Sequence, residues 1–289
     1  MEIYQLASLC FFSLIMGIVS LWIYRNPWIY CPFFVISFFL GLAAKILTPI
    51  ALLPLGGLFI LHGFLKTGTR GIRRPIFVVL AAAISLAMWM HIMPGFHSLK
   101  ISDHFVQSAG AYPYTFNLNW DKPMTGIFIL AWAFPLITTR EQLKKVLFVT
   151  LPYTIGAVLI ILLLSVWLNV VKWDPKMPPY FWLWAIANLF LVSIPEEALI
   201  RGFIQKEFFS WFGEKGFLAN AGCILATSLI FALIHIKGVP SSSYILLVFV
   251  ASILYGSIYQ YTKAIESSIF CHYAVNIVHL LFFTYPALK

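Results

Sequence analysis

The chain has 289 residues, of which 61% are hydrophobic and only 10% are charged, and its formal net charge is +9. A soluble domain carries about 25% charged residues, so 19 basic and 10 acidic side chains could not cover a soluble fold of this size. The long apolar blocks also exclude a transmembrane β-barrel, whose strands would alternate over segments of about ten residues. We therefore identify an integral membrane protein built from helices.

The chain contains ten segments that approach the roughly 20 mostly apolar residues of a helical span. Because Lys45 and Pro49 could mark a kink or a re-entrant pair, we expect eight to ten transmembrane helices. The fold class is an all-α polytopic membrane helix bundle with an intramembrane polar cavity. In chain order the segments are 4–24, 27–44, 46–65, 75–94, 123–139, 146–169, 180–205, 217–236, 244–261 and 266–285.

Charges between the segments predict the orientation and the domains. Two short loops are strongly basic, so the positive-inside rule places them in the cytosol and the charge-balanced loop 95–122 outside. Topology thus explains the positive charge without a nucleic-acid partner. Residues 1–145 have no acidic residue inside an apolar block, and we divide the chain into an accessory bundle (1–145) and a functional core (146–289). The basic residues are Lys66, Arg70, Arg73, Arg74, Arg140, Lys144 and Lys145.

Four scattered cysteines form no CxxC pair, and we interpret them as small buried residues rather than as a disulfide framework or a zinc site. They are Cys10, Cys31, Cys223 and Cys271.

Two adjacent carboxylates, Glu196 and Glu197, lie in the apolar run FWLWAIANLFLVSIPEEALIRGF. One carboxylate at a helix centre costs about 2.5–3.5 kcal/mol on insertion scales, so the pair requires partners or a polar cavity. Arg201 follows Glu197 by four residues, which predicts an ion pair on one helix face. Glu196 leaves the helix about 100° away and is the candidate general base. The alternative is a solvated helix end in the cytosol.

Histidines and an asparagine recur in the following spans. His235 closes the run TSLIFALIHI, one turn after Phe231. His272 and Asn276 are four residues apart and share a helix face, which His279 extends. A single histidine in an apolar helix is more often a core residue, and we interpret two histidines of the N-terminal half in that way, His62 and His91.

These side chains suit hydrolysis of a peptide bond. A carboxylate and an imidazole can hold and deprotonate a water molecule, and a second imidazole and an amide can donate to the oxyanion. Glu196, His235 and His272 could also bind a divalent metal such as zinc, because two histidines and a glutamate are a common catalytic zinc set. The spacing leaves both mechanisms open, so the cofactor is unknown.

Three motifs resemble those of the CPBP family, the CAAX protease and bacteriocin-processing intramembrane proteases related to type II CAAX prenyl endopeptidases. They are Glu196-Glu197-x-x-x-Arg201, Phe231-x-x-x-His235 and His272-x-x-x-Asn276. The resemblance covers about residues 146–285 and implies a helical membrane bundle with its site in a cavity within the membrane. It implies a glutamate-dependent or metal-dependent protease whose catalytic residues are Glu196, His235, His272 and Asn276, supported by Glu197, Arg201 and Phe231.

The resemblance predicts an endopeptidase for a membrane-associated protein or peptide, in the plasma (inner) membrane of a prokaryote. It does not carry over a prenylated CAAX substrate, because many members do not process one, and residues 1–145 have no counterpart in the minimal family core. Two other classes stay open. A proton-coupled transporter would also use buried Glu, Arg and His, and a non-catalytic scaffold or immunity protein would use none of them for chemistry.

A shared site raises a question of depth. His235 lies near the end of its span and His272 only six residues into its own. A common depth requires strongly tilted helices, a segment 203–216 that dips into the bilayer, or another topology. We expect tilt and a deep start of the span 217–236.

Overall fold

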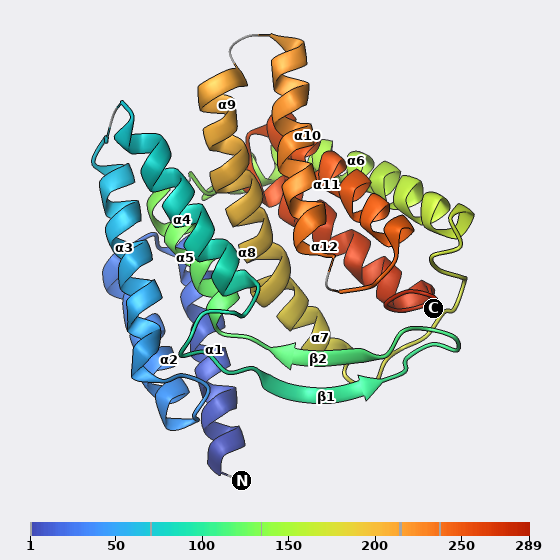
Figure 1. Cartoon of the computed structure of the whole chain (residues 1–289), viewed down its shortest axis with the longest axis horizontal. Helices are drawn as coiled ribbons and strands as arrows, with labels where there is room; N and C mark the ends of the chain where they lie inside the picture. Colours follow the sequence, from blue (N-terminus) through green and yellow to red (C-terminus); the bar gives the residue numbers. More distant parts are fainter. Residues whose placement is uncertain (1, 70, 134, 214–215, 237) are drawn as a thin grey trace. The chain divides into compact units, whose positions relative to one another are not determined.

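The computed structural model describes residues 2–69, 71–133, 135–213, 216–236 and 238–289. Helices account for most of these residues (Figure 1). Within the described residues, seven helices are long and apolar enough to cross a membrane, and Pro27–Ala43 is a shorter apolar helix. The protein is an all-α polytopic membrane bundle, and this prediction is confirmed.

The chain forms two compact units that are interleaved in the sequence. The first unit comprises Met1–Leu99, Asn117–Thr138 and Phe190–Phe203, and the second comprises Lys100–Phe116, Thr139–Leu189 and Ile204–Lys289. One change of unit, between residues 138 and 139, lies close to the predicted boundary at 145. The predicted division concerns function rather than contacts, and it stays a prediction.

The first unit is organised around α5 (Asp121–Ala133), which contacts α1, α3, α4 and the short α8 (Ile194–Glu197). In addition, α1 packs on α2 and α3 packs on α4. Between α2 and α3, Lys45 adopts a positive φ of 59° and Pro49 opens a 3-10 turn. The second and third predicted segments are therefore separate helices with a break where those residues predicted it. The bounds are Glu2–Ile23 for α1, Pro27–Ala43 for α2, Leu52–Lys66 for α3 and Arg73–Trp89 for α4.

A two-stranded hairpin lies within the loop 95–122, where the sequence predicted no regular structure. Its strands are β1 (Leu99–Phe105) and β2 (Tyr114–Leu118), which run antiparallel in Figure 1. The run YTFNL in β2 is rich in residues that favour strands. The backbone N–H of His104 donates to the hydroxyl of Thr115 across the pair, at 3.3 Å.

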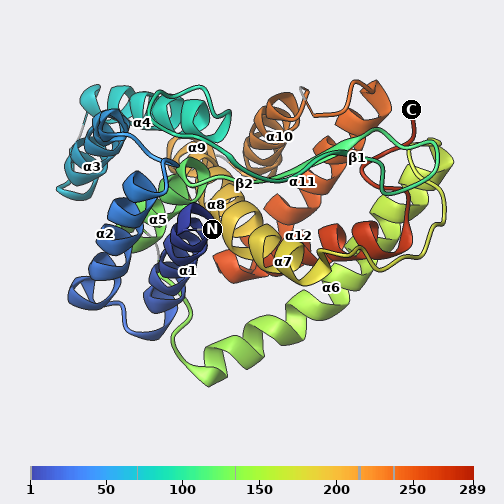
Figure 2. The same cartoon turned by 90° about the horizontal axis from the view of Figure 1, so that it is seen from below.

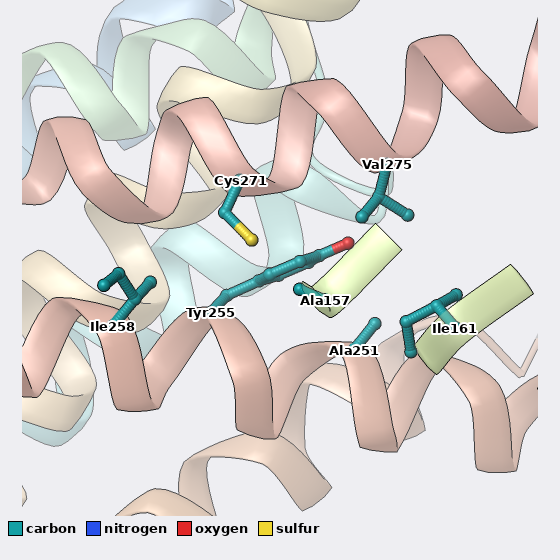
Figure 3. Packing of buried hydrophobic residues seen from close by; sticks show 7 residues of the cluster. All are labelled: Ala157, Ile161, Ala251, Tyr255, Ile258, Cys271 and Val275. Carbon is teal, nitrogen blue, oxygen red and sulfur yellow. The ribbon is translucent and has the colours of Figure 1, made fainter. Parts of the chain in front are cut away.

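The second unit is built mainly from long helices that pack against one another. α6 (Arg140–Trp167) packs on α11 and α12, α11 packs on α10 and α12, and α10 packs on α9 (Figure 2). The Tyr255 ring lies between α11 and α12 in a core of mostly small and branched side chains (Figure 3). The core contains Ala157, Ile161, Ala251, Tyr255, Ile258, Cys271 and Val275. The other bounds are Phe181–Ala187 for α7, Lys206–Phe212 for α9, Phe217–Ile234 for α10, Ser242–Thr262 for α11 and Ile265–Phe282 for α12.

The acidic pair belongs to one helical run of 32 residues, Phe181–Phe212. Two π-helical stretches, Asn188–Ser193 and Ala198–Gln205, flank α8 within it. Such π-turns often occur at functional sites. The run continues past residue 205, where the predicted span ended, because the apolar and aromatic residues of α9 extend the helix. Residues 206–212 are thus helical, and whether the segment 203–216 dips into the bilayer stays a prediction.

Candidate active site

Glu197 and Arg201 form the ion pair that their spacing predicted. The Arg201 Nε donates to Glu197 Oε2 at 3.2 Å, and both side chains are fully buried. The attraction between two opposite charges in the protein interior offsets part of the free-energy cost of removing each from water. The alternative of a solvated helix end is therefore wrong, because neither side chain reaches solvent.

Glu196 has a different cationic partner, which sequence analysis missed. Lys122, in the first turn of α5, donates from Nζ to Glu196 Oε1. The Glu196 side chain is 3% exposed and that of Lys122 is 12% exposed. The sequence offered no local signal for this pair, because the two residues are 74 positions apart. The two neighbouring carboxylates thus have separate cationic partners.

The second unit brings together Phe231, His235 and His272 of the other two motifs in an aromatic cluster. The Phe231 ring lies 4.6 Å from that of His235 and 6.0 Å from that of His272, measured between centroids. The Tyr255 ring stacks on His272 at 4.8 Å with an interplanar angle of 14°. Both histidines therefore adjoin one phenylalanine, although their positions along α10 and α12 suggested different depths. Sequence analysis missed Tyr255, since nothing distinguished it from other tyrosines of its span.

The hydrogen-bond partner of His235 shows which of its two ring nitrogens carries the proton. The Nδ1 atom lies 2.7 Å from the backbone carbonyl oxygen of Phe231. A carbonyl oxygen only accepts hydrogen bonds, so Nδ1 carries a proton. In the neutral ring the lone pair then lies on Nε2. That tautomer suits an imidazole that accepts a hydrogen bond from water.

Asn276 is held by a residue that sequence analysis also missed. Its Nδ2 donates to Asn188 Oδ1 at 3.1 Å. Asn188 is buried and starts the first π-helical stretch. An amide nitrogen carries two hydrogens, so one N–H of Asn276 is directed to Asn188 and fixes the plane in which the second lies. Asn188 is the single polar residue of the run FWLWAIANLFLV. Its isolation among apolar residues could have marked it as a candidate site residue.

The three other histidines that the sequence analysis singled out make contacts of a structural kind. His62 is buried in the first unit and packs against Phe128 and Phe203, as expected of a core residue. His91 is not a core residue, because it lies at the end of α4 with a partly exposed side chain and bonds the buried Asp121 through Nδ1. His279 lies on the predicted face of α12, and its Nε2 bonds the carbonyl oxygen of Thr284 at 3.1 Å.

One prediction about the assembled site stays a prediction, and a second one finds no support. Glu196 belongs to the first unit and the histidines to the second, and a single cavity lined by all of them is untested. Among the residues that the structure describes, no group of three His, Cys, Asp or Glu side chains could hold a metal ion. The metal set of Glu196, His235 and His272 thus finds no support, and a metalloprotease is not indicated.

Comparison with known families identifies the part of the chain that carries these motifs. Residues 178–278 match the family model described as type II CAAX prenyl endopeptidase Rce1-like. Comparisons with curated proteins and with solved structures found no match. The matched range contains every motif residue from Glu196 to Asn276, and Asn188 as well. Residues 178–278 therefore form an Rce1-like domain of the CPBP family of CAAX-type proteases.

Proposed function

We propose that this protein is an intramembrane endopeptidase that hydrolyses a peptide bond of a membrane-associated protein or peptide. One observation carries the proposal: two adjacent buried carboxylates have separate cationic partners, Arg201 for Glu197 and Lys122 for Glu196. The Rce1-like domain supports the reaction class, and we place the protein in the plasma membrane of a prokaryote.

Glu196 acts as the general base in this proposal. Its carboxylate takes a proton from a water molecule, which His235 orients by accepting the second O–H at Nε2. The water oxygen then attacks the carbonyl carbon of the scissile peptide. Glu196 passes the proton to the leaving nitrogen, the C–N bond breaks, and a carboxylic acid and an amine result.

His272 and Asn276 donate hydrogen bonds to the oxyanion that forms at the carbonyl oxygen of the substrate. The stacking of His272 on Tyr255 fixes the plane of its ring. The hydrogen bond from Asn276 to Asn188 fixes the plane of its amide. Groups that are already oriented stabilise developing charge most, because they do not reorganise during the reaction.

The test is Glu196→Gln, with Glu197→Gln as the matched control one residue away. Purified protein in liposomes is offered two probes, a farnesylated CAAX peptide and a library of unprenylated apolar peptides, and mass spectrometry detects new termini. Glu196→Gln should reduce hydrolysis by about 10²–10⁴-fold, the usual contribution of a positioned acid–base group. Glu197→Gln should mainly lower thermal stability and retain more turnover per folded molecule.

Hydrolysis by Glu196→Gln at the wild-type rate would overturn the proposed base. If the wild-type protein cleaves neither probe, the liposomes can be tested for proton-coupled uptake. A pH change inside them driven by a transported solute would favour the transporter. Absence of both activities would favour the scaffold or immunity protein.

A further inference from the structure

Lys122 differs from a lysine that serves membrane topology alone. A lysine at a helix end usually extends its ammonium group toward water. Lys122 instead is 12% exposed, and its Nζ bonds Glu196 and lies 4.7 Å from the centre of the Trp89 ring. An aromatic face attracts a cation and excludes water from it. The ammonium group is thus confined between a carboxylate and an indole.

The neighbouring acidic residue does not compete for this ammonium group. Asp121 directly precedes Lys122, and both of its carboxylate oxygens lie within 2.9 Å of His91 Nδ1. Asp121 Oδ1 also accepts the backbone N–H of Lys122 at 2.9 Å. These contacts fix the start of α5 to the end of α4 and leave Glu196 as the acidic partner of the Lys122 side chain.

Close packing of α5 against α8 determines that the Lys122 side chain can contact Glu196. Gly126 lies one turn after Lys122 on the same face of α5. A Cβ atom at Gly126 would lie 2.6 Å from the Cα of Pro195, so only glycine permits this approach. Pro195 immediately precedes Glu196. The contact between Gly126 and Pro195 therefore brings α5 against α8 within one helical turn of the pair of Lys122 and Glu196.

We infer that Lys122 is a positioning residue for the reaction: its ammonium group holds Glu196 Oε1 and thereby orients the carboxylate whose other oxygen faces the water. This inference rests on the proposed function, because it assigns Lys122 a role through Glu196. Lys122 itself does not touch the substrate. A misplacement of about 1 Å in a reacting group can cost about 10²-fold in rate.

The experiment compares Lys122→Met, Lys122→Arg and Glu196→Gln in the liposome assay with the unprenylated peptide library. Lys122→Met keeps an unbranched side chain, one heavy atom shorter, but removes the charge, and its kcat should fall by about 10²-fold with KM within about threefold. Lys122→Arg restores a cation and should recover most of the kcat. Lys176→Met is the matched control. That lysine is 15% exposed and bonds Asp174 at 3.1 Å, and its replacement should leave kcat unchanged.

Thermal unfolding in detergent tests the pair independently of activity. Lys122→Met and Glu196→Gln each remove one charge of a buried ion pair and should lower the melting temperature by about 5–10 °C. The double variant removes both charges, so its melting temperature should exceed that of Lys122→Met. Simple additivity of the two losses would show that the pair is not coupled and would overturn the inference.

The two proposals fail in different ways. A Lys122→Met protein with wild-type kcat, beside an inactive Glu196→Gln protein, would overturn the role of Lys122 and leave the proposed function intact. Loss of kcat in Lys122→Met without recovery in Lys122→Arg, at equal folded fractions, would also count against a cationic role. A fully active Glu196→Gln protein would overturn both proposals.

Discussion

At the scale of single residues, the buried ion pair of Glu197 and Arg201 should support the fold. Arg201→Ala would remove the cation that faces the Glu197 carboxylate, in an interior where both side chains are fully buried. Breaking such a pair costs about 3–5 kcal/mol, and the free energy of unfolding should fall accordingly. Thermal or denaturant unfolding in detergent measures the change.

An exposed pair supplies the control for Arg201. Lys100 and Asp103 bond at 2.7 Å, but their side chains are 57% and 47% exposed. Exposed pairs contribute little to stability because water and salt screen them, so Lys100→Ala should have little effect on unfolding. Equal stability of the Arg201→Ala and Lys100→Ala proteins would show that the buried pair is not needed for folding.

The amide pair of Asn188 and Asn276 leads to a kinetic prediction. Asn276→Ala should lower kcat by about 10²–10³-fold with little change in KM, because it removes one oxyanion donor. Asn188→Ala should lower kcat less, since it frees the amide of Asn276 without removing it. The double variant should be no slower than Asn276→Ala, because residues that act as a unit are not additive. Independent, multiplied losses in kcat would argue against this orientation.

At the scale of helices, the close contact of α5 and α8 should tolerate no side chain on its glycine. Gly126→Ala would place a methyl group 2.6 Å from a backbone atom of Pro195. Overpacking of this kind costs about 1–3 kcal/mol, and the shift of α8 should also reduce turnover. Melting temperature and kcat of the same preparation measure the two effects together.

Gly156 in α6 is the matched control, since a Cβ there has no neighbour within 4 Å. Gly156→Ala should leave stability unchanged or raise it by up to about 1 kcal/mol through helix propensity. If Gly126→Ala proved as stable and as active as Gly156→Ala, the two helices would not need their close approach.

What the sequence predicted depended on distance along the chain. Each of the ten apolar segments contains a helix among its described residues, because the length of an apolar block is a local property. The Glu197–Arg201 pair was predictable because four residues separate its members. Lys122 and Asn188 were not, since their partners lie 74 and 88 positions away. The strand β1 was missed as well, because LKISDHF has no clear alternation and its residues are largely exposed.

At the scale of the whole chain, the Rce1-like domain should not work without the N-terminal half. A fragment of residues 139–289 contains every motif residue, but its segment Phe190–Phe203 belongs to the first unit, with Lys122 as a partner. Expressed alone, this fragment should be unstable and inactive. Co-expression with residues 1–138 should restore hydrolysis, which the liposome assay measures. Full activity of the fragment alone would show that the first unit is dispensable.

The interleaving of the two units also bears on how the protein is made. Lys122 is synthesised 74 residues before Glu196, so the cation of this pair leaves the ribosome first. Glu197 follows, and Arg201 emerges only four residues later. The two carboxylates therefore enter the membrane when one counter-ion is already in place and the other is about to arrive. The order of translation itself thus limits the time for which either negative charge has to remain in lipid alone.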